Sequence, residues 1–161
     1  MDVTSDPGFI DVHEQLALSL DGTRAGTAFD EFVGAHPPDG GTDARLRLKA
    51  PVWLPNLGAE IELRGDVIAT FFPVRAKPAG ATACATVTWY GGVDAPFPRL
   101  HGHLWVTPAT ADTSWLRFDG RYRRMPSTVR LAAPGESVIG HRIVLATARL
   151  LLREVAGALR R

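Results

Sequence analysis

Apolar and polar residues alternate along most of the chain, which is the two-residue period of a strand with one buried face. Leucines alternate with Gln15, Ala17 and Ser19 in the segment Phe9–Leu20, which predicts a first strand there. The same alternation predicts strands over Arg45–Lys49, Glu60–Arg64, Val67–Val74, Ala83–Tyr90, Leu100–Thr107 and Ser114–Arg123. In these segments the charged residues occupy only every second position. This arrangement indicates antiparallel strands with one solvated face, because buried parallel strands are apolar on both faces. The connections have hairpin length, and Arg64-Gly65-Asp66 is predicted to be one of the turns.

Two segments show the helical period instead. Thr23–Val33 has apolar residues at helical spacing, and this short helix cannot run past Gly34 and the Pro37-Pro38 pair. A longer pattern begins at Ser137, which can cap a helix, and runs nearly to the C-terminus, with arginines on one side and apolar residues on the other. Roughly 24 helical residues span about 36 Å, enough to cross a sheet. The pattern therefore predicts an α+β protein.

The composition is that of one compact domain. The chain has 161 residues, 45% of them hydrophobic, with 18 basic and 17 acidic side chains. A chain of this length buries about 70% of the surface that its unfolded form exposes, so we expect a single domain over 1–161. Residues 1–44 carry nine acidic side chains against Arg24 alone, whereas residues 115–161 carry ten arginines against three acidic side chains. We expect the two ends to attract each other, and no nucleic-acid partner, because the overall charge is balanced.

Cysteine content and the ends of the chain favour a cytoplasmic protein. Cys84 is the only cysteine, which excludes an intramolecular disulfide and a thiolate metal cluster within one chain. The first residues contain Asp2 and Asp6 and lack a basic segment followed by an apolar one, so no secretory signal is expected. Arginines interrupt the apolar stretch Val138–Leu159, so we expect no membrane span. We expect no cofactor either.

The second half of the chain carries a set of residues with a family likeness: Phe97-Pro98, Leu100, Gly102, Leu104, Val106, Pro108, Leu116, Gly120, Tyr122 and His141-Arg142. Together with the order of elements, this set resembles bacterial members of the START and polyketide-cyclase superfamily (SRPBCC). The chain departs from the pattern at Arg124-Met125-Pro126, where two consecutive prolines are expected. The resemblance implies a helix-grip fold, in which a curved antiparallel sheet of six or seven strands surrounds the long C-terminal helix. It also implies a ligand-sized interior.

A sheet that grips a helix hides one parity of each strand. The inward positions are then the even-numbered ones of the last two predicted strands and the odd-numbered ones of the strand before them. Nearly all of these residues are apolar. Only Trp89 and Tyr122 among them carry a polar group, with His141 on the terminal helix and Glu14 on the first strand as further candidates. Such an interior favours binding of a hydrophobic small molecule or lipid. The predicted ligand-binding residues are Trp89, Leu104, Phe118, Tyr122, His141, Leu145 and Leu152.

Two other functions stay open, and no residue is assigned as catalytic. The first is a cyclase or dehydratase acting on a polyketide-like substrate, in which Tyr122 or His141 would donate or accept a proton and Glu14 would tune the charge. The second is a protein-interaction domain. Trp105 and Trp115 have the outward parity, so they would form the interface of a homodimer or be covered by the N-terminal segment.

A metal site was also considered, and the sequence pattern does not favour it. His101 and His103 share one face of a strand, as ligands of a barrel metal site do. A third ligand is missing, because Leu104–Ala111 contains no acidic residue. The parity of the histidines is opposite to that of Leu100, so we expect them to point outward. We therefore expect no metal.

Overall fold

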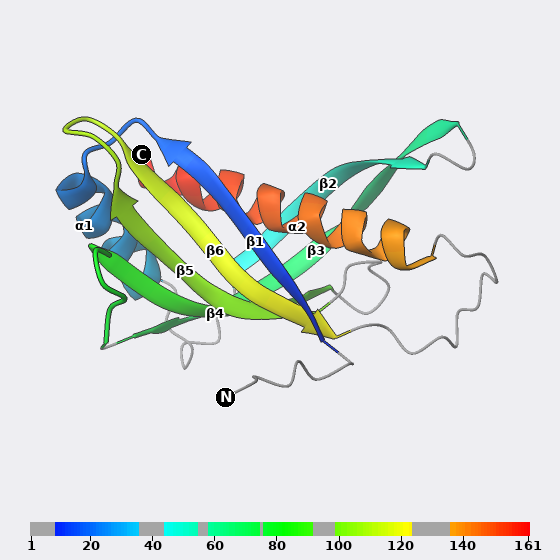
Figure 1. Ribbon diagram of the computed structural model, residues 1–161, viewed down its shortest axis with the longest axis horizontal. Helices are drawn as coiled ribbons and strands as arrows, with labels where there is room; N and C mark the ends of the chain where they lie inside the picture. The colour runs from blue at the N-terminus through cyan, green and yellow to red at the C-terminus, as the bar shows by residue number, and fades with distance from the viewer. Residues whose placement is uncertain (1–8, 36–43, 55–57, 75, 92–98, 124–135) are drawn as a thin grey trace.

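The computed structural model describes residues 9–35, 44–54, 58–74, 76–91, 99–123 and 136–161 (Figure 1), and the backbone alone for 44–54, 61, 63–66, 91, 123, 136–140 and 143. Its strands are β1 (Phe9–Leu18), β2 (Ala44–Leu54), β3 (Ala59–Pro73), β4 (Ala83–Gly91), β5 (Leu100–Pro108) and β6 (Ser114–Arg123). The helices are α1 (Gly22–Gly34) and α2 (Glu136–Leu159).

The strands form one antiparallel sheet in the order β1-β6-β5-β4-β3-β2. β1 therefore pairs with the last strand, β6, and lies at the opposite edge from β2. The sheet curls around α2, which packs against β1 and β6 on one side and against β2 on the other (Figure 1). α1 packs against β3, β4 and β5. This architecture is the helix-grip fold that the resemblance implied.

The predicted elements are present, with one correction. Glu60–Arg64 and Val67–Val74, predicted as two strands with a turn between them, belong to the single strand β3. There is no turn, because Gly65 continues the backbone ladder with β2, opposite Leu48. The sheet thus has six strands, within the six or seven that were predicted. The side-chain directions expected at 45–49 lie outside the described residues.

Local features cap α1 and hold it close to the sheet. Asp21 Oδ1 accepts two hydrogen bonds of 3.0 Å from backbone N–H groups of the first turn, which a helix start otherwise leaves unpaired. A Cβ on Gly22 would lie 2.6 Å from Pro108 Cγ, and one on Gly26 would lie 2.9 Å from Thr82 Oγ1. These glycines allow the close approach by which α1 covers one end of the interior.

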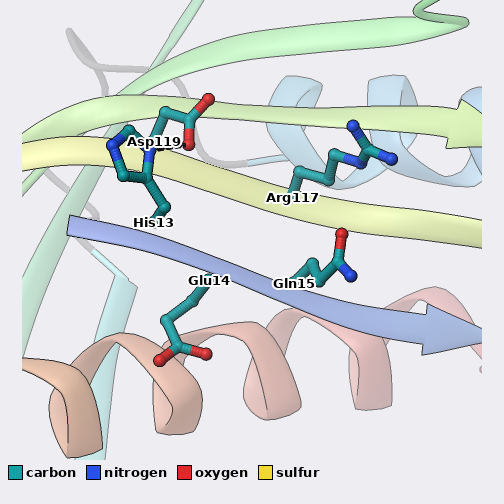
Figure 2. Close-up of a pocket in the computed structure, with 5 residues that line it drawn as sticks. All are labelled: His13, Glu14, Gln15, Arg117 and Asp119. Carbon is teal, nitrogen blue, oxygen red and sulfur yellow. Dashed lines mark hydrogen bonds and ion pairs between the residues drawn. The ribbon is translucent and has the colours of Figure 1, made fainter.

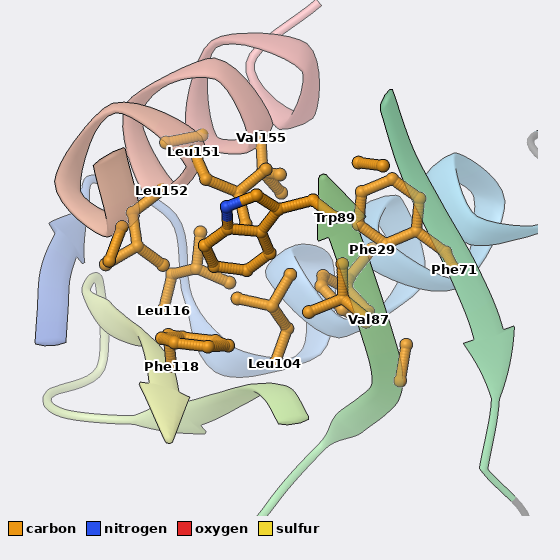
Figure 3. Close-up of a cluster of buried hydrophobic side chains, with 14 of the residues drawn as sticks. Phe29, Phe71, Val87, Trp89, Leu104, Leu116, Phe118, Leu151, Leu152 and Val155 are labelled. Atoms are coloured by element: carbon orange, nitrogen blue, oxygen red, sulfur yellow. The ribbon is translucent and has the colours of Figure 1, made fainter. Parts of the chain in front are cut away.

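The core lies between the sheet and the two helices (Figure 3). Burial alternates along β5, where positions 100, 102, 104 and 106 are buried and positions 101 and 103 are exposed. β6 shows the same parity, with Leu116, Phe118 and Tyr122 buried. The prediction that even-numbered positions of these two strands face inward is therefore confirmed.

Candidate functional site

The candidate site is the interior between the sheet and α2, and its inner face is organised in rows that run across the strands. We call each set of residues paired across neighbouring strands a rung. The Tyr122 rung consists of Ile10, Tyr122, Leu100, Trp89 and Ala69. The next inward-facing rung, the glycine rung, consists of Val12, Gly120, Gly102, Val87 and Phe71. The Glu14 rung follows, with Glu14, Phe118, Leu104, Ala85 and Pro73.

The two glycines make room for an aromatic ring on the inner face. A Cβ on Gly120 would lie 2.2 Å from Phe118 Cζ, and one on Gly102 would lie 2.6 Å from Phe118 Cε2. The Phe118 ring therefore lies over the glycine rung, in space that side chains at positions 102 and 120 would otherwise occupy. The ring in turn contacts Trp89, with the two centroids 4.9 Å apart and the planes at 49°.

Trp89 is the largest fully buried side chain of the molecule as described. Its indole lies between the Leu151 and Val155 side chains of α2 and the Leu104 and Phe118 side chains of the sheet (Figure 3). The indole Nε1 is shielded from solvent and has no hydrogen-bond partner among the described residues. An N–H group of this kind is uncommon in folded proteins, because a buried donor without an acceptor lowers stability.

Tyr122 and His141 come together at the N-terminal part of α2. The Tyr122 hydroxyl lies 3.4 Å from His141 Nδ1, and the two ring centroids are 6.3 Å apart. Tyr122 is buried and His141 is half-buried. Two of the three groups considered for proton transfer are thus within hydrogen-bond reach of each other.

Glu14 faces inward, as its phase with Leu16 and Leu18 predicted. Its partner is a residue of α2 and not the Tyr122 and His141 pair. Its Oε1 accepts a hydrogen bond of 2.9 Å from Arg149 Nε on α2. The Glu14 side chain is 13% exposed, whereas that of Arg149 is 59% exposed. Glu14 lies two inward rungs from Tyr122, so it belongs to the contact between β1 and α2 rather than to the Tyr122 and His141 pair.

The seven predicted ligand-binding residues all lie on the inner side. Leu104, Phe118 and Leu152 are buried in the core, and Leu145 is half-buried against it. Their role as ligand contacts stays a prediction. Two buried polar residues were not predicted: Ser114 at the start of β6 and Thr147 on α2. Thr147 lies on the apolar side of α2, where helical spacing would have indicated its burial.

The outer face of the sheet carries the histidines, as predicted. His101 Nδ1 lies 2.8 Å from Thr88 Oγ1, and His103 Nδ1 lies 3.3 Å from Thr86 Oγ1. Within the described residues no three His, Cys, Asp or Glu side chains are arranged to hold a metal ion. The expectation that these two histidines point outward is confirmed.

A shallow pocket on this outer face was not predicted. It has a volume of about 340 Å³ and is lined by His13, Glu14, Gln15, Arg117 and Asp119, and the Glu14 side chain points away from the other four, toward α2 (Figure 2). The imidazole of His13 contacts the Asp119 carboxylate across the β1 and β6 pair. The sequence shows neither fact, because both depend on the register between the first and last strands. This pocket lies beside the edge strand β1, not between the sheet and α2.

The outward tryptophans are less exposed than expected. Trp105 and Trp115 are half-buried among outer-face neighbours, while the large exposed hydrophobic side chains are Phe9, Phe72 and Tyr90, each about 40% exposed. Arg121 lies over the Phe9 ring, 5.1 Å from its centroid. The homodimer proposed for this face stays a prediction.

No protein-family model matches the sequence, and no curated protein matches it. Within the described residues, neither helix combines the length and apolar character needed to cross a membrane. Among solved structures, the chain is similar to a norcoclaurine synthase from Thalictrum flavum in complex with dopamine and hydroxybenzaldehyde, with 10% identity, coverage of 94% of this chain and 87% of that one, and a TM-score of 0.48.

The chain is also similar to two further solved structures. A START superfamily protein from Mycobacterium smegmatis is 14% identical, with coverage of 91% of this chain and 97% of that one, and a TM-score of 0.43. The ZhuI aromatase/cyclase from Streptomyces sp. R1128 is 13% identical, with coverage of 95% and 94% and a TM-score of 0.41. At these low scores the fold is assigned from the strand order and helix placement of this chain itself.

Proposed function

We propose that the protein binds a hydrophobic small molecule or lipid between the sheet and α2. The supporting observation is the apolar inner face: on the three rungs defined above, the side chains of the described residues are apolar except for Glu14, Trp89 and Tyr122. Glu14 is already paired with Arg149. An apolar interior with a small number of polar groups is typical of a binding site for a hydrophobic ligand.

The position of α2 also supports this proposal. α2 packs against β1, β6 and β2, which are the strands at and next to the edges, whereas α1 packs against β3, β4 and β5. The middle of the interior is therefore filled by long side chains such as Trp89 and Phe118, aided by Gly102 and Gly120. Long side chains can change rotamer and admit a ligand where closely packed backbones cannot.

The test is binding of 2-isopropenylnaphthalene, an uncharged two-ring hydrocarbon, measured by equilibrium dialysis. We expect saturable binding of one molecule per chain. Leu145→Trp enlarges a half-buried side chain against the core and should weaken binding at least about tenfold, which corresponds to 1.4 kcal/mol. Ala17→Trp adds the same group at an exposed outer position and should leave binding unchanged. Binding that is absent in the parent protein, or equally affected by both variants, would contradict the proposal.

A second function, acid–base catalysis of cyclisation or dehydration, is favoured by one observation. The hydroxyl of Tyr122 and Nδ1 of His141 lie 3.4 Å apart, so one could remove a proton while the other donates one. The test is incubation with an oligo-β-ketone and detection of products that have lost water by mass spectrometry. Tyr122→Phe and His141→Gln should each abolish such products, while Glu14→Gln should not.

The cytoplasm is the compartment that we propose for the protein. Cys84 is buried as a free thiol. Free thiols persist in reducing compartments, whereas secreted proteins usually pair theirs.

A further inference from the structure

We propose that the bound molecule carries a neutral hydrogen-bond acceptor, such as a ketone or ester carbonyl, which accepts a hydrogen bond from Trp89 Nε1. This inference rests on the proposed function and specifies the class of ligand. It assigns Trp89 as the residue that selects the ligand by its polar group. The remainder of the interior would recognise the ligand through apolar contact alone.

The first observation is the state of the indole N–H. Trp89 is 0% exposed, and no described residue offers its Nε1 a hydrogen-bond partner. Buried polar groups in native proteins nearly always have partners, and each exception calls for an explanation. A ligand acceptor explains this one, because a donor without a partner in the free protein gains its hydrogen bond upon binding.

The second observation is that, among the described residues, no side-chain acceptor lies within hydrogen-bond distance of the indole N–H. The core side chains drawn around the indole include Leu104, Phe118, Leu151 and Val155, which are apolar (Figure 3). The strand that carries Trp89, β4, lies between β3 and β5, so its backbone groups pair on both sides.

Other solvent-shielded polar atoms without partners lie elsewhere. Thr107 Oγ1 and Arg117 Nε belong to residues of the outward parity. Ser114 Oγ belongs to the first residue of β6, which pairs with Leu18 at the end of β1. Trp89 Nε1 is the one that lies within the proposed binding site, on the same rung as Tyr122.

The charges around the site indicate a neutral acceptor. Glu14, the acidic group on the inner face, is paired with Arg149, whose side chain is mostly exposed. A carboxylate beside Trp89 would lose its hydration without gaining a positive partner, which is strongly unfavourable. A ketone or ester oxygen loses less hydration and needs one donor. In an otherwise apolar site, a few polar groups usually fix the orientation of the ligand.

The test compares two isosteric probes, 2-acetylnaphthalene and 2-isopropenylnaphthalene, which differ in a C=O against a C=CH₂ group. Dissociation constants are measured by equilibrium dialysis for the parent protein, Trp89→Phe and the outer-face control Trp105→Phe. The phenylalanine keeps an aromatic ring and removes the donor. We expect the ratio of the two constants to shift against the ketone by about three- to tenfold in Trp89→Phe and to stay unchanged in Trp105→Phe.

The outcomes separate the two claims. Absence of binding of both probes to the parent protein would overturn the proposed function and this inference with it. Binding of both probes with a ratio that Trp89→Phe leaves unchanged would overturn this inference alone. Tyr122→Phe is the further control, because a shift in that variant instead would assign the acceptor contact to the other polar side chain of the rung.

A measurement on the parent protein covers the case in which Trp89→Phe does not fold. The indole N–H signals of ¹⁵N-labelled protein are recorded with each probe, and the Trp89 signal is identified by changing the other three tryptophans singly to phenylalanine. We expect 2-acetylnaphthalene to move the signal of the Trp89 indole proton downfield. We expect 2-isopropenylnaphthalene not to cause this downfield shift. Equal effects of the two probes would contradict a hydrogen bond to the ketone.

Discussion

The Phe118 ring over the glycine rung is the tightest local arrangement of the inner face. We expect Gly120→Ala to lower the free energy of unfolding by about 1–3 kcal/mol, because the new Cβ would meet Phe118 Cζ at 2.2 Å and His101 O at 2.7 Å. Urea unfolding followed by circular dichroism measures this. Gly34→Ala is the matched control, since a Cβ there has no atom within 4 Å. A Gly120→Ala variant as stable as Gly34→Ala would show that the ring has room to move.

Cys84, which pairs with Trp105 on the outer face of the sheet, provides a pH-dependent test of burial there. Burial raises the pKa of its thiol above the ordinary value, and the nearby Lys77 partly offsets this. The folded state therefore favours the neutral thiol, so its contribution to stability is present below the unfolded pKa, about 8.5, and is lost as the pH rises through the folded value. We expect the free energy of unfolding to fall more steeply above that pH in the parent protein than in Cys84→Ala. Equal slopes would contradict the burial of the thiol.

Among the elements, β1 and α2 are joined by the contact between Glu14 and Arg149. We expect a double-mutant cycle with Glu14→Gln and Arg149→Gln to give a coupling energy of about 0.5–1 kcal/mol, because one partner is nearly buried and the other is solvated. The same cycle with the exposed Arg153→Gln is the control and should show no coupling. A coupling energy near zero for Glu14 and Arg149 would mean that the pair does not hold the helix to β1.

The sequence predicts the elements well and their register poorly. Alternation identifies which side of each strand is buried, because the two-residue period is local. The pairing of β1 with β6 brings together residues more than 100 positions apart, such as His13 with Asp119, and no local pattern contains that information. The outer pocket was missed for this reason. The continuity of β3 through Gly65 was missed because glycine in a strand and glycine in a turn look alike.

At the scale of the whole molecule, the uneven charge of the two chain ends is consistent with their contact in the fold. The acidic first part supplies Glu14, and the arginine-rich last part supplies Arg149 and the strand that pairs with β1. Association between copies of the chain through the outer face of the sheet stays a prediction. This face carries the half-buried Trp105 and Trp115, and the exposed Phe9, Phe72 and Tyr90 lie elsewhere on it.

If this outer face is a dimer interface, Trp115→Arg should convert dimers to single chains. The arginine would place a charge in the contact. The free energy lost by burying that charge exceeds the free energy that the packing there contributes. Size-exclusion chromatography with light scattering measures the mass, and circular dichroism checks that the variant is folded. Glu31→Arg, on the exposed side of α1, is the control and should leave the mass unchanged. A single-chain mass for the parent protein, or a dimer that survives Trp115→Arg, would contradict the interface.

The most direct test of a ligand between the sheet and α2 is to locate a bound probe by NMR. The protein is labelled with ¹³C at leucine and threonine methyl groups and saturated with 2-acetylnaphthalene. We predict nuclear Overhauser contacts from the probe to both Leu104 on β5 and Leu152 on α2, which belong to the core from the sheet and from the helix. Contacts confined to the outer-face Thr86 and Thr88, or no contacts at saturation, would contradict a binding site inside the grip.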